Sequence, residues 1–102
     1  MTFRIVVRAT PRKEDQDRFE AAYRQVTETV RGTPGHLRDE LLRDTGDGRT
    51  YILLAEWESE QAFRAWEDDP GHLRMAAPML PYWGDDGVER RIFEVRARLD
   101  SV

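Results

Sequence analysis

The chain has 102 residues, of which 39% are hydrophobic and 35% are charged, with a net charge of −4 and no cysteine. This is the length of one ordinary domain, so we expect residues 1–102 to fold as a single domain around one core. The absence of cysteine excludes disulfides, thiolate metal sites and cysteine nucleophiles. Acidic and basic residues are interleaved, which argues against nucleic acid as a partner because phosphate contacts need clustered positive charge.

The apolar segments of the chain are short. No apolar run approaches the roughly 18 residues that cross a bilayer. The segment after Met1 passes directly into a strand-like alternation, without the apolar region of a signal peptide. We therefore expect a cytoplasmic protein that has no membrane partner.

Hydropathy patterns in the first half of the chain predict a strand, a helix and two further strands. Residues 3–10 alternate between two faces, as a strand does. Residues 14–31 place their apolar side chains on one stripe of a helix, and Gly32 follows its end. Residues 36–43 and 50–57 predict two strands joined by a hairpin loop rich in Asp and Gly.

The second half of the chain predicts another helix and a last strand. Ser59 can cap a helix that ends before Pro70, because the residue preceding a proline is biased away from helical conformation. We expect a short helical stretch at about residues 72–77 and then an irregular segment rich in proline and glycine. Residues 88–99 alternate again and predict the final strand.

The predicted order is βαββαβ, which is the ferredoxin-like arrangement of the α+β class. In this fold a four-stranded antiparallel sheet carries its helices on one face. Two helices cannot cover both faces, and several strands place apolar residues on the side away from any helix. We therefore expect a homodimer in which a second copy packs against the uncovered face.

Three segments of the chain carry a family resemblance. They are the turn Thr33-Pro34-Gly35, the run Trp57-Glu58-Ser59-Glu60-Gln61-Ala62-Phe63-Arg64 and the pair Asp69-Pro70. Together they resemble the antibiotic biosynthesis monooxygenase superfamily, and most nearly its anthrone monooxygenases of the actinorhodin type. The resemblance implies a dimeric α/β barrel. It also implies one of several activities: cofactor-free oxidation of phenolic polyketides, haem degradation, quinol oxidation or polyketide cyclisation.

Some of the family's site residues are present in this sequence, and others are replaced. Trp57 matches the tryptophan of the anthrone-oxidising site, whereas Leu53 and Phe63 replace the asparagine and the tyrosine of that site. For the haem-degrading members, Trp66 matches the tryptophan that crowds the porphyrin. The two other haem-site positions, an axial histidine and an asparagine, are an alanine and a valine here, at positions 76 and 7. The resemblance therefore implies an enzyme that uses no cofactor and takes molecular oxygen as co-substrate.

Residues 36–43 carry the candidate acid–base residues. Regular alternation along a strand would place four side chains on one face: His36, Arg38, Glu40 and Leu42. If that face lines a cavity, a base, a cation and a carboxylate converge there, the last two as substrate-binding groups. In the opposite register Leu37 and Leu41 point inward, and the polar residues lie in solvent or at a dimer interface.

Aromatic residues and the second histidine are the other candidates. Trp57, Trp66 and Trp83 are possible walls for a flat polycyclic substrate, and equally possible core residues. Tyr51 shares a strand face with Trp57, where its hydroxyl would orient a substrate phenol or serve the structure alone. His72 is either an acid–base residue at the edge of the pocket or a surface histidine. We predict no metal site, because the acidic clusters at residues 58–60 and 67–69 do not converge and have no histidine nearby. We expect both clusters to lie in solvent.

These observations favour a cofactor-independent monooxygenase that oxidises a phenolic, polycyclic, polyketide-like substrate to a quinone. A base, His36 or His72, would remove a proton, and the electron-rich anion would react with O2. Trp57 would belong to the catalytic site, and Arg38 would stabilise the developing oxyanion. Two alternatives remain open: a polyketide cyclase of the same fold that uses the same base without O2, and a dimeric small-molecule-binding module without catalysis.

Overall fold

The structure, a computed structural model, describes residues 2–71, 76–84 and 87–102. Its elements are, in chain order, β1 (Phe3–Ala9), η1 (Lys13–Asp15), α1 (Gln16–Val30), β2 (His36–Arg43), β3 (Tyr51–Trp57), α2 (Glu60–Glu67), η2 (Ala77–Tyr82) and β4 (Glu89–Glu94). The prefix η denotes a 3₁₀ helix. No helix in the described ranges is long and apolar enough to cross a membrane.

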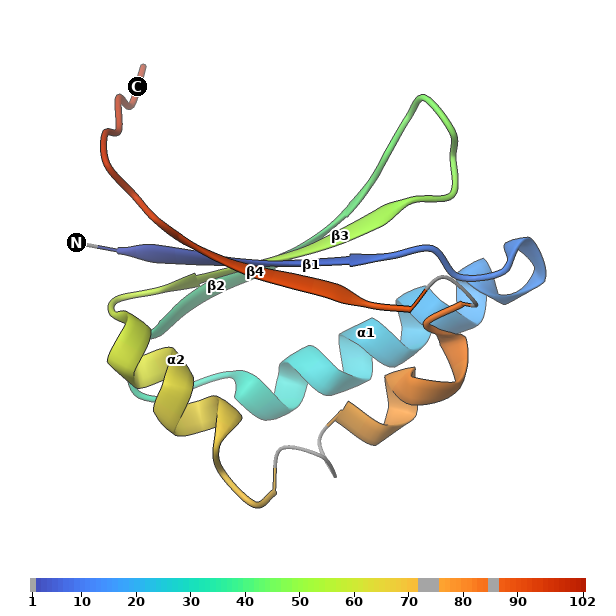
Figure 1. Ribbon diagram of the computed structural model, residues 1–102, viewed down its shortest axis with the longest axis horizontal. Coiled ribbons are helices and arrows are strands. Elements are labelled where there is room, and N and C mark those ends of the chain that lie inside the picture. The colour runs from blue at the N-terminus through green and yellow to red at the C-terminus, as the bar shows by residue number, and fades with distance from the viewer. Residues whose placement is uncertain (1, 72–75, 85–86) are drawn as a thin grey trace.

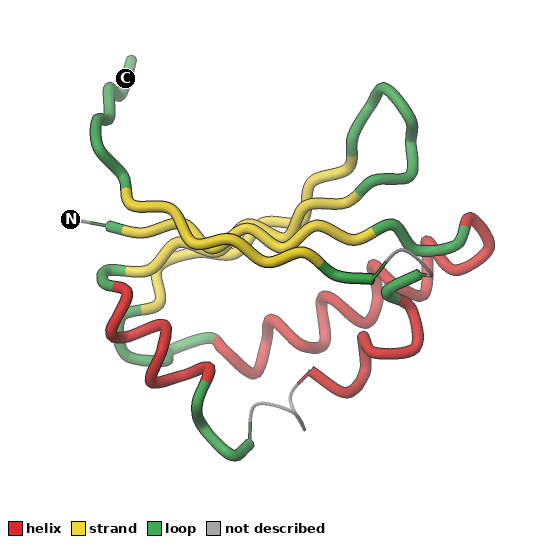
Figure 2. The backbone as a smooth tube through the Cα atoms, viewed as in Figure 1, coloured by secondary structure: helices red, strands yellow, loops and turns green. Residues whose placement is uncertain are grey.

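The strands form one sheet in the order β2-β3-β1-β4, and every neighbouring pair is antiparallel. The described helices all lie on one face of this sheet (Figure 1), so that the molecule has a strand layer and a helical layer (Figure 2). This arrangement confirms the ferredoxin-like α+β fold. We call the face toward the helices the inner face and the opposite one the outer face.

The inner face carries the core. On β3, Tyr51 and Trp57 are each 1% exposed, and they point to the same side because an even number of residues separates them. The stripe predicted for the first helix packs against them, with Phe19 fully buried and its ring centroid 5.0 Å from that of Tyr51. Val30, at the end of α1, packs with Trp57 in the second half of the core.

A tight turn sets the position of β2 relative to α2. The amide of His36 donates to the carbonyl of Thr33 at 3.0 Å, and Gly35 has a φ of 87°. A Pro at the second and a Gly at the third position of such a turn suit its type II geometry. A β-carbon at Gly35 would lie 2.5 Å from the β-carbon of Ala62, so the turn and α2 are in close contact there.

The second helix begins and ends where local chemistry predicts. The Ser59 hydroxyl accepts a hydrogen bond from the amide of Ala62 at 3.1 Å, which confirms the cap. The helix ends at Glu67, ahead of Pro70. The stretch predicted for residues 72–77 begins at residues that lie outside the described ranges.

Two predictions for the last third of the chain are wrong. The segment predicted to be irregular forms the 3₁₀ helix η2, with Pro78 in its first turn and Met79 buried. The strand predicted over residues 88–99 ends at Glu94, which pairs with Phe3 at the start of β1. The amide of Val95 still donates to the carbonyl of Thr2 at 3.0 Å, and the remaining segment then leaves the sheet as an irregular chain (Figure 2).

Candidate functional site

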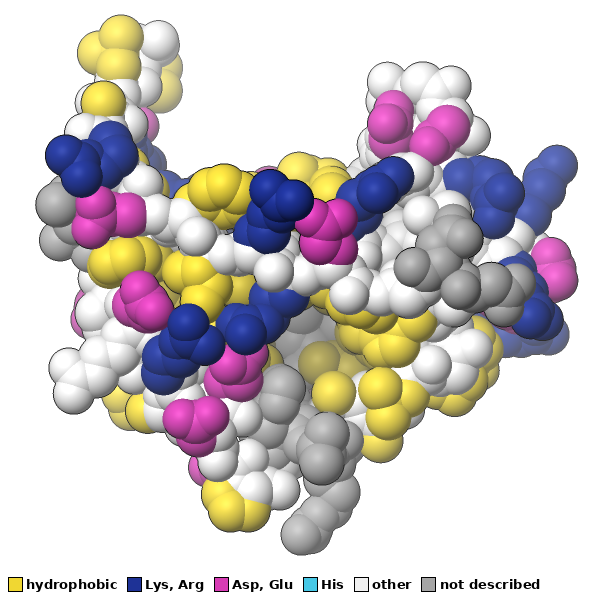
Figure 3. All heavy atoms as spheres, viewed as in Figure 1, with side chains coloured by type: hydrophobic (Ala, Val, Ile, Leu, Met, Phe, Trp, Pro, Cys, Tyr) yellow, Lys and Arg dark blue, Asp and Glu magenta, His cyan; other side chains and the backbone are white. Residues whose placement is uncertain are grey.

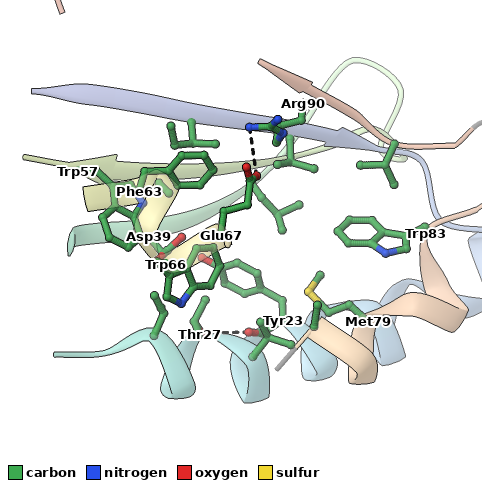
Figure 4. Close-up of a pocket in the computed structure, with 18 residues that line it drawn as sticks. Tyr23, Thr27, Asp39, Trp57, Phe63, Trp66, Glu67, Met79, Trp83 and Arg90 are labelled. Carbon is green, nitrogen blue, oxygen red and sulfur yellow. Dashed lines mark hydrogen bonds and ion pairs between the residues drawn. The ribbon is translucent and has the colours of Figure 1, made fainter. Parts of the chain in front are cut away.

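A cavity of about 240 Å³ lies between the inner face of the sheet and the helical layer. The surface is hollowed there, with hydrophobic side chains inside the hollow (Figure 3). Most of the described residues that line the cavity are apolar or aromatic, and they come from every strand and from α1, α2 and η2 (Figure 4). The charged side chains among them are Asp39, Glu67 and Arg90.

The structure places all three tryptophans at the cavity wall. Trp57 and Trp66 lie with ring centroids 5.7 Å apart, and Phe63 completes this group at 5.8 Å from Trp57. Trp83 lines the far end of the cavity, where its ring lies 5.8 Å from Phe19 (Figure 4). Flat aromatic walls of this kind suit a flat aromatic ligand.

The indole N–H of Trp57 is a buried donor. Trp57 is 1% exposed, and its Nε1 has no hydrogen-bond partner among the described residues. A buried polar group without a partner costs free energy, so such groups are uncommon and often mark a ligand position. Because Trp57 lines the cavity, its indole N–H is a candidate donor to a bound molecule.

A β-bulge near the start of β2 decides which of its side chains face the cavity. His36 pairs with Trp57, but Arg38 pairs with Glu56, so that Leu37 is the extra residue. Successive residues of β3 face opposite sides, and His36 and Arg38 therefore do so too. The expected shared face of His36, Arg38, Glu40 and Leu42 is therefore wrong. The opposite register is confirmed for Leu41, which faces inward, and for Arg38 and Glu40, which face outward, but it is wrong for His36.

The outer face carries the residues that the bulge moves away from the cavity. Arg38 is 60% exposed in its side chain, with its Nε 4.0 Å from Glu56 Oε2. Arg4 Nε lies 3.3 Å from the other oxygen of Glu56. Glu40 pairs with Leu54 on the same side and is exposed. Neither Arg38 nor Glu40 lines the cavity, so the expectation that they bind substrate there does not fit the structure.

His36 and Asp39 come together on the inner face. His36 Nε2 is hydrogen-bonded to Asp39 Oδ2, and both side chains are largely buried. Asp39 lines the cavity, whereas His36 lies behind it with its ring edge-on to Trp57, 5.1 Å between centroids. Burial raises the pKa of Asp39, and the nearby His36 partly opposes this rise.

Tyr23 approaches the same carboxylate from α1. Its ring lines the cavity and reaches toward Asp39 (Figure 4). Burial, together with the negative charges of Asp39 and Glu40, raises the pKa of Tyr23, so that the phenol stays protonated. The sequence places Tyr23 on the apolar stripe of the first helix. That position does not show whether a tyrosine fills the core or faces a cavity.

A second charged group joins α2 to β4 at the cavity wall. Arg90 Nη1 lies 3.1 Å from Glu67 Oε2, and the guanidinium carbon is 5.7 Å from the ring centroid of Phe63 (Figure 4). Glu67 is also 3.5 Å from Arg64 Nη1 on its own helix. Glu67 belongs to the acidic cluster that the sequence assigned to solvent, and the structure corrects this for that residue.

Two other predicted site residues remain, Tyr51 and His72. Tyr51 lies on the strand face of Trp57, as predicted, but its hydroxyl donates to Glu20 Oε2 at 2.5 Å inside the core and does not line the cavity. Burial and then Glu20 raise the pKa of Tyr51. His72 lies outside the described residues.

The donor set that the described residues give the cavity fits neither haem nor a protein-bound metal. Val7 and Ala76 occupy the wall, so the two positions that the resemblance associates with haem carry alkyl groups. In the described part of the chain, no group of three or more His, Cys, Asp or Glu side chains could hold a metal ion. The described residues of the wall offer apolar contact, the buried indole N–H groups of Trp57 and Trp66, the phenol of Tyr23, a carboxylate and an ion pair.

Comparison with known proteins identifies relatives of this chain. Residues 2–78 match the family described as antibiotic biosynthesis monooxygenase. The chain is 32% identical over 79 residues to protein SchA of Streptomyces halstedii, covering 78% of this chain and 21% of SchA. A mycobilin-producing haem oxygenase of Mycobacterium tuberculosis is 39% identical over 41 residues, covering 40% of this chain and 39% of that enzyme. The chain thus spans about a fifth of the length of SchA.

Among solved structures, the fold is similar to that of SnoaB, a cofactor-independent oxygenase from Streptomyces nogalater. The superposition has a TM-score of 0.82 and 26% sequence identity, and it covers 96% of each chain. The family match, the shared fold and the aromatic cavity agree with one another. The chain belongs to the antibiotic biosynthesis monooxygenase family.

Proposed function

We propose that the chain is a cofactor-independent monooxygenase that oxidises a phenolic polycyclic substrate to a quinone inside this cavity. The observation that carries the proposal is the buried N–H of Trp57, which has no hydrogen-bond partner among the described residues, in a wall that is mostly apolar and aromatic. Such a wall binds fused rings by stacking and apolar contact, and the N–H supplies the one donor that a substrate carbonyl or phenolate needs. The similarity to SnoaB, a cofactor-independent oxygenase, supports the same chemistry.

The size of the cavity favours a compact substrate. Its volume of about 240 Å³ is below the 300–1,000 Å³ common for sites that hold drug-sized ligands. Trp57 and Trp66 lie at one end of the cavity and Trp83 at the other, so that aromatic rings bound its length (Figure 4). We therefore expect a small fused-ring compound such as a hydroxylated anthrone or naphthol.

The reaction requires a base, an electron-rich anion and exclusion of water. A base at the cavity removes a proton from the substrate methylene, and the carbanion gives one electron to O2. The radical pair joins in a carbon–oxygen bond to form a peroxide. The O–O bond then breaks: the carbon loses its second proton and keeps one oxygen as a carbonyl, and the other oxygen leaves as water. Four electrons pass from carbon to oxygen, so no other reductant is needed.

The protein groups available for this reaction are few. The His36–Asp39 pair supplies the base on the sheet side of the cavity. Trp57 donates to the oxygen on which charge develops. Apolar side chains from the sheet and α1 keep water away, which strengthens both interactions.

We also propose that two copies associate through the outer face of the sheet. The described helices cover only the inner face, and the outer face carries Val6, Ile52 and Leu54 at its centre. Leu42 and Phe93 on that face are 42% and 48% exposed in the single chain. A second copy offers the same surface, which is what a twofold interface requires.

Oxygen consumption with a simple anthrone tests the proposed function. The protein should consume O2 above the buffer rate and release the anthraquinone. Ala55 lines the cavity, and Ala55→Phe should abolish this uptake by filling it, whereas Ala21→Phe on the exposed side of α1 should not. A product that forms equally well under argon would instead identify a cyclase, and ligand binding without any product would identify a binding module.

A further inference from the structure

We infer that Asp39 is the catalytic base of this site and that His36 is the residue that positions it. The inference rests on the proposed function, since it assigns the proton transfer within that reaction. It differs from the expectation drawn from the sequence, which gave the role of base to His36 or His72.

Access to the cavity distinguishes Asp39 from its partner. Asp39 lines the cavity wall, and His36 does not. The His36 ring lies between the Asp39 carboxylate, to which its Nε2 is bonded, and the ring of Trp57, which it meets edge-on. A substrate in the cavity therefore meets the carboxylate, and a general base must be within hydrogen-bond reach of the proton that it takes.

The bulge in β2 places His36 and Asp39 on the same face of the sheet. Residues three apart on a regular strand face opposite sides of the sheet. Because Leu37 is an extra residue, His36 opposite Trp57 and Asp39 opposite Ala55 both face inward. The bond to His36 uses one oxygen of the carboxylate and fixes its orientation, and the other oxygen remains for a substrate proton.

The surroundings of Asp39 favour proton uptake. Burial raises its pKa, which makes the carboxylate a better base than one in water. The titratable and charged groups around it are His36 on β2, Tyr23 on α1, and Glu67 and Arg90 on the wall formed by α2 and β4. Tyr23 remains protonated and can donate to an oxygen anion, but it cannot accept the proton.

The proton transfers balance over one turnover. The free oxygen of Asp39 takes a proton from the acidic C–H or O–H of the substrate, and the electron pair of the broken bond stays on the substrate as an enolate or phenolate. When the peroxide has formed, Asp39 returns this proton to the distal oxygen. As the O–O bond breaks, the second proton of the methylene is transferred to the same oxygen, which leaves as water. The carboxylate is then restored, and His36 has held it in place throughout.

Deuterium exchange into the methylene of anthrone under argon measures this step without O2. We expect wild-type protein to accelerate exchange over buffer, and Asp39→Asn to lower the rate by roughly 10²- to 10⁴-fold, the usual contribution of a positioned base. His36→Phe keeps the carboxylate and should cause a smaller loss. Glu40→Gln removes the neighbouring carboxylate from the outer face and should leave the rate unchanged.

Chemical rescue distinguishes the loss of a catalytic group from a disturbance of the fold. Added formate should restore part of the exchange to Asp39→Ala, because a small carboxylate can enter the space that the side chain leaves. Added imidazole should not restore His36→Ala. Rescue by imidazole but not by formate, or a greater loss in His36→Phe than in Asp39→Asn, would overturn the assignment.

The same measurement separates this inference from the proposed function. If exchange depends on Asp39 but the protein consumes no O2, the assignment of Asp39 as the base stands and the proposed oxygenase function is refuted. If oxygen uptake persists in Asp39→Asn, the proposed oxygenase function stands and the assignment of Asp39 as the base is refuted. A wild-type protein that catalyses neither exchange nor uptake with anthrones and naphthols would count against both.

Discussion

Arg90 Nη1 lies 3.1 Å from Glu67 Oε2, and this ion pair joins the last residue of α2 to the edge strand β4 at the cavity wall. The two opposite charges cancel at this part of the wall. The Arg90 guanidinium also lies over the Phe63 ring. Its side chains are 40% and 21% exposed, so solvent screens the interaction. The pair thus influences the charge of the ligand that the cavity accepts.

Glu67→Gln should therefore strengthen the binding of an anionic aromatic ligand. A partly exposed ion pair is worth about 0.5–1 kcal/mol, so we expect 2-naphthoate to bind about two- to five-fold more tightly. Fluorescence quenching of the wall tryptophans provides the measurement. Added salt should reduce the gain, and neutral 2-naphthol should bind as before. An equal gain for both ligands would mean that the substitution acts on cavity shape and not on charge.

Gly35→Ala should destabilise the protein more than Gly32→Ala. Both glycines have positive φ, which costs an alanine about 1–2 kcal/mol. At Gly32 a β-carbon meets nothing within 4 Å, whereas at Gly35 it lies 2.5 Å from Ala62 of α2. The additional loss for Gly35→Ala in urea denaturation measures the contact between the turn and the helix. Equal losses would show that α2 moves aside without cost.

The outer face should hold two copies together in solution. We expect a dimer by sedimentation at micromolar concentration, and we expect Leu54→Arg at the centre of that face to convert it into a monomer. Leu80→Arg is the matched control, because Leu80 is 52% exposed on η2 in the helical layer. A wild-type monomer, or a dimer that only Leu80→Arg dissociates, would place the interface elsewhere or remove it.

The protein should not bind haem as a haem oxygenase does, although it is partly similar in sequence to one. Val7 and Ala76 line the cavity with alkyl groups that cannot coordinate iron. Titration with haemin should give no saturable one-to-one Soret band. A tight band with the spectrum of axial histidine ligation would point to a ligand other than these two wall residues.

Local chemistry made much of the fold predictable. The bounds of β2, the Ser59 cap and the end of α2 before Pro70 depend on residues close in sequence, and the structure agrees with them. The end of β4 at Glu94 depends on a distant partner, because Glu94 pairs with Phe3 at the start of β1 and the amide of Val95 then donates to the carbonyl of Thr2. Alternation along residues 88–99 carries no information about that distant partner.

The candidate site was less predictable for a related reason. One bulge residue, Leu37, reverses the side that each following residue of β2 faces, and the pattern of polar and apolar residues does not reveal it. Asp39 was therefore missed, while Arg38 and Glu40 were placed in the cavity. Glu67 appeared as one member of an exposed acidic run, because its partner Arg90 lies on a strand far along the chain.

The source of the oxygen in the product tests the central claim most directly. Anthrone is oxidised under ¹⁸O₂ by protein pretreated with a chelator, and the quinone is analysed by mass spectrometry. We expect one ¹⁸O atom in the new carbonyl, the other in water, and a rate that the chelator and added flavin leave unchanged. Quinone whose new oxygen comes from water, or turnover that stops until a metal or flavin is supplied, would contradict cofactor-independent oxygenation in this cavity.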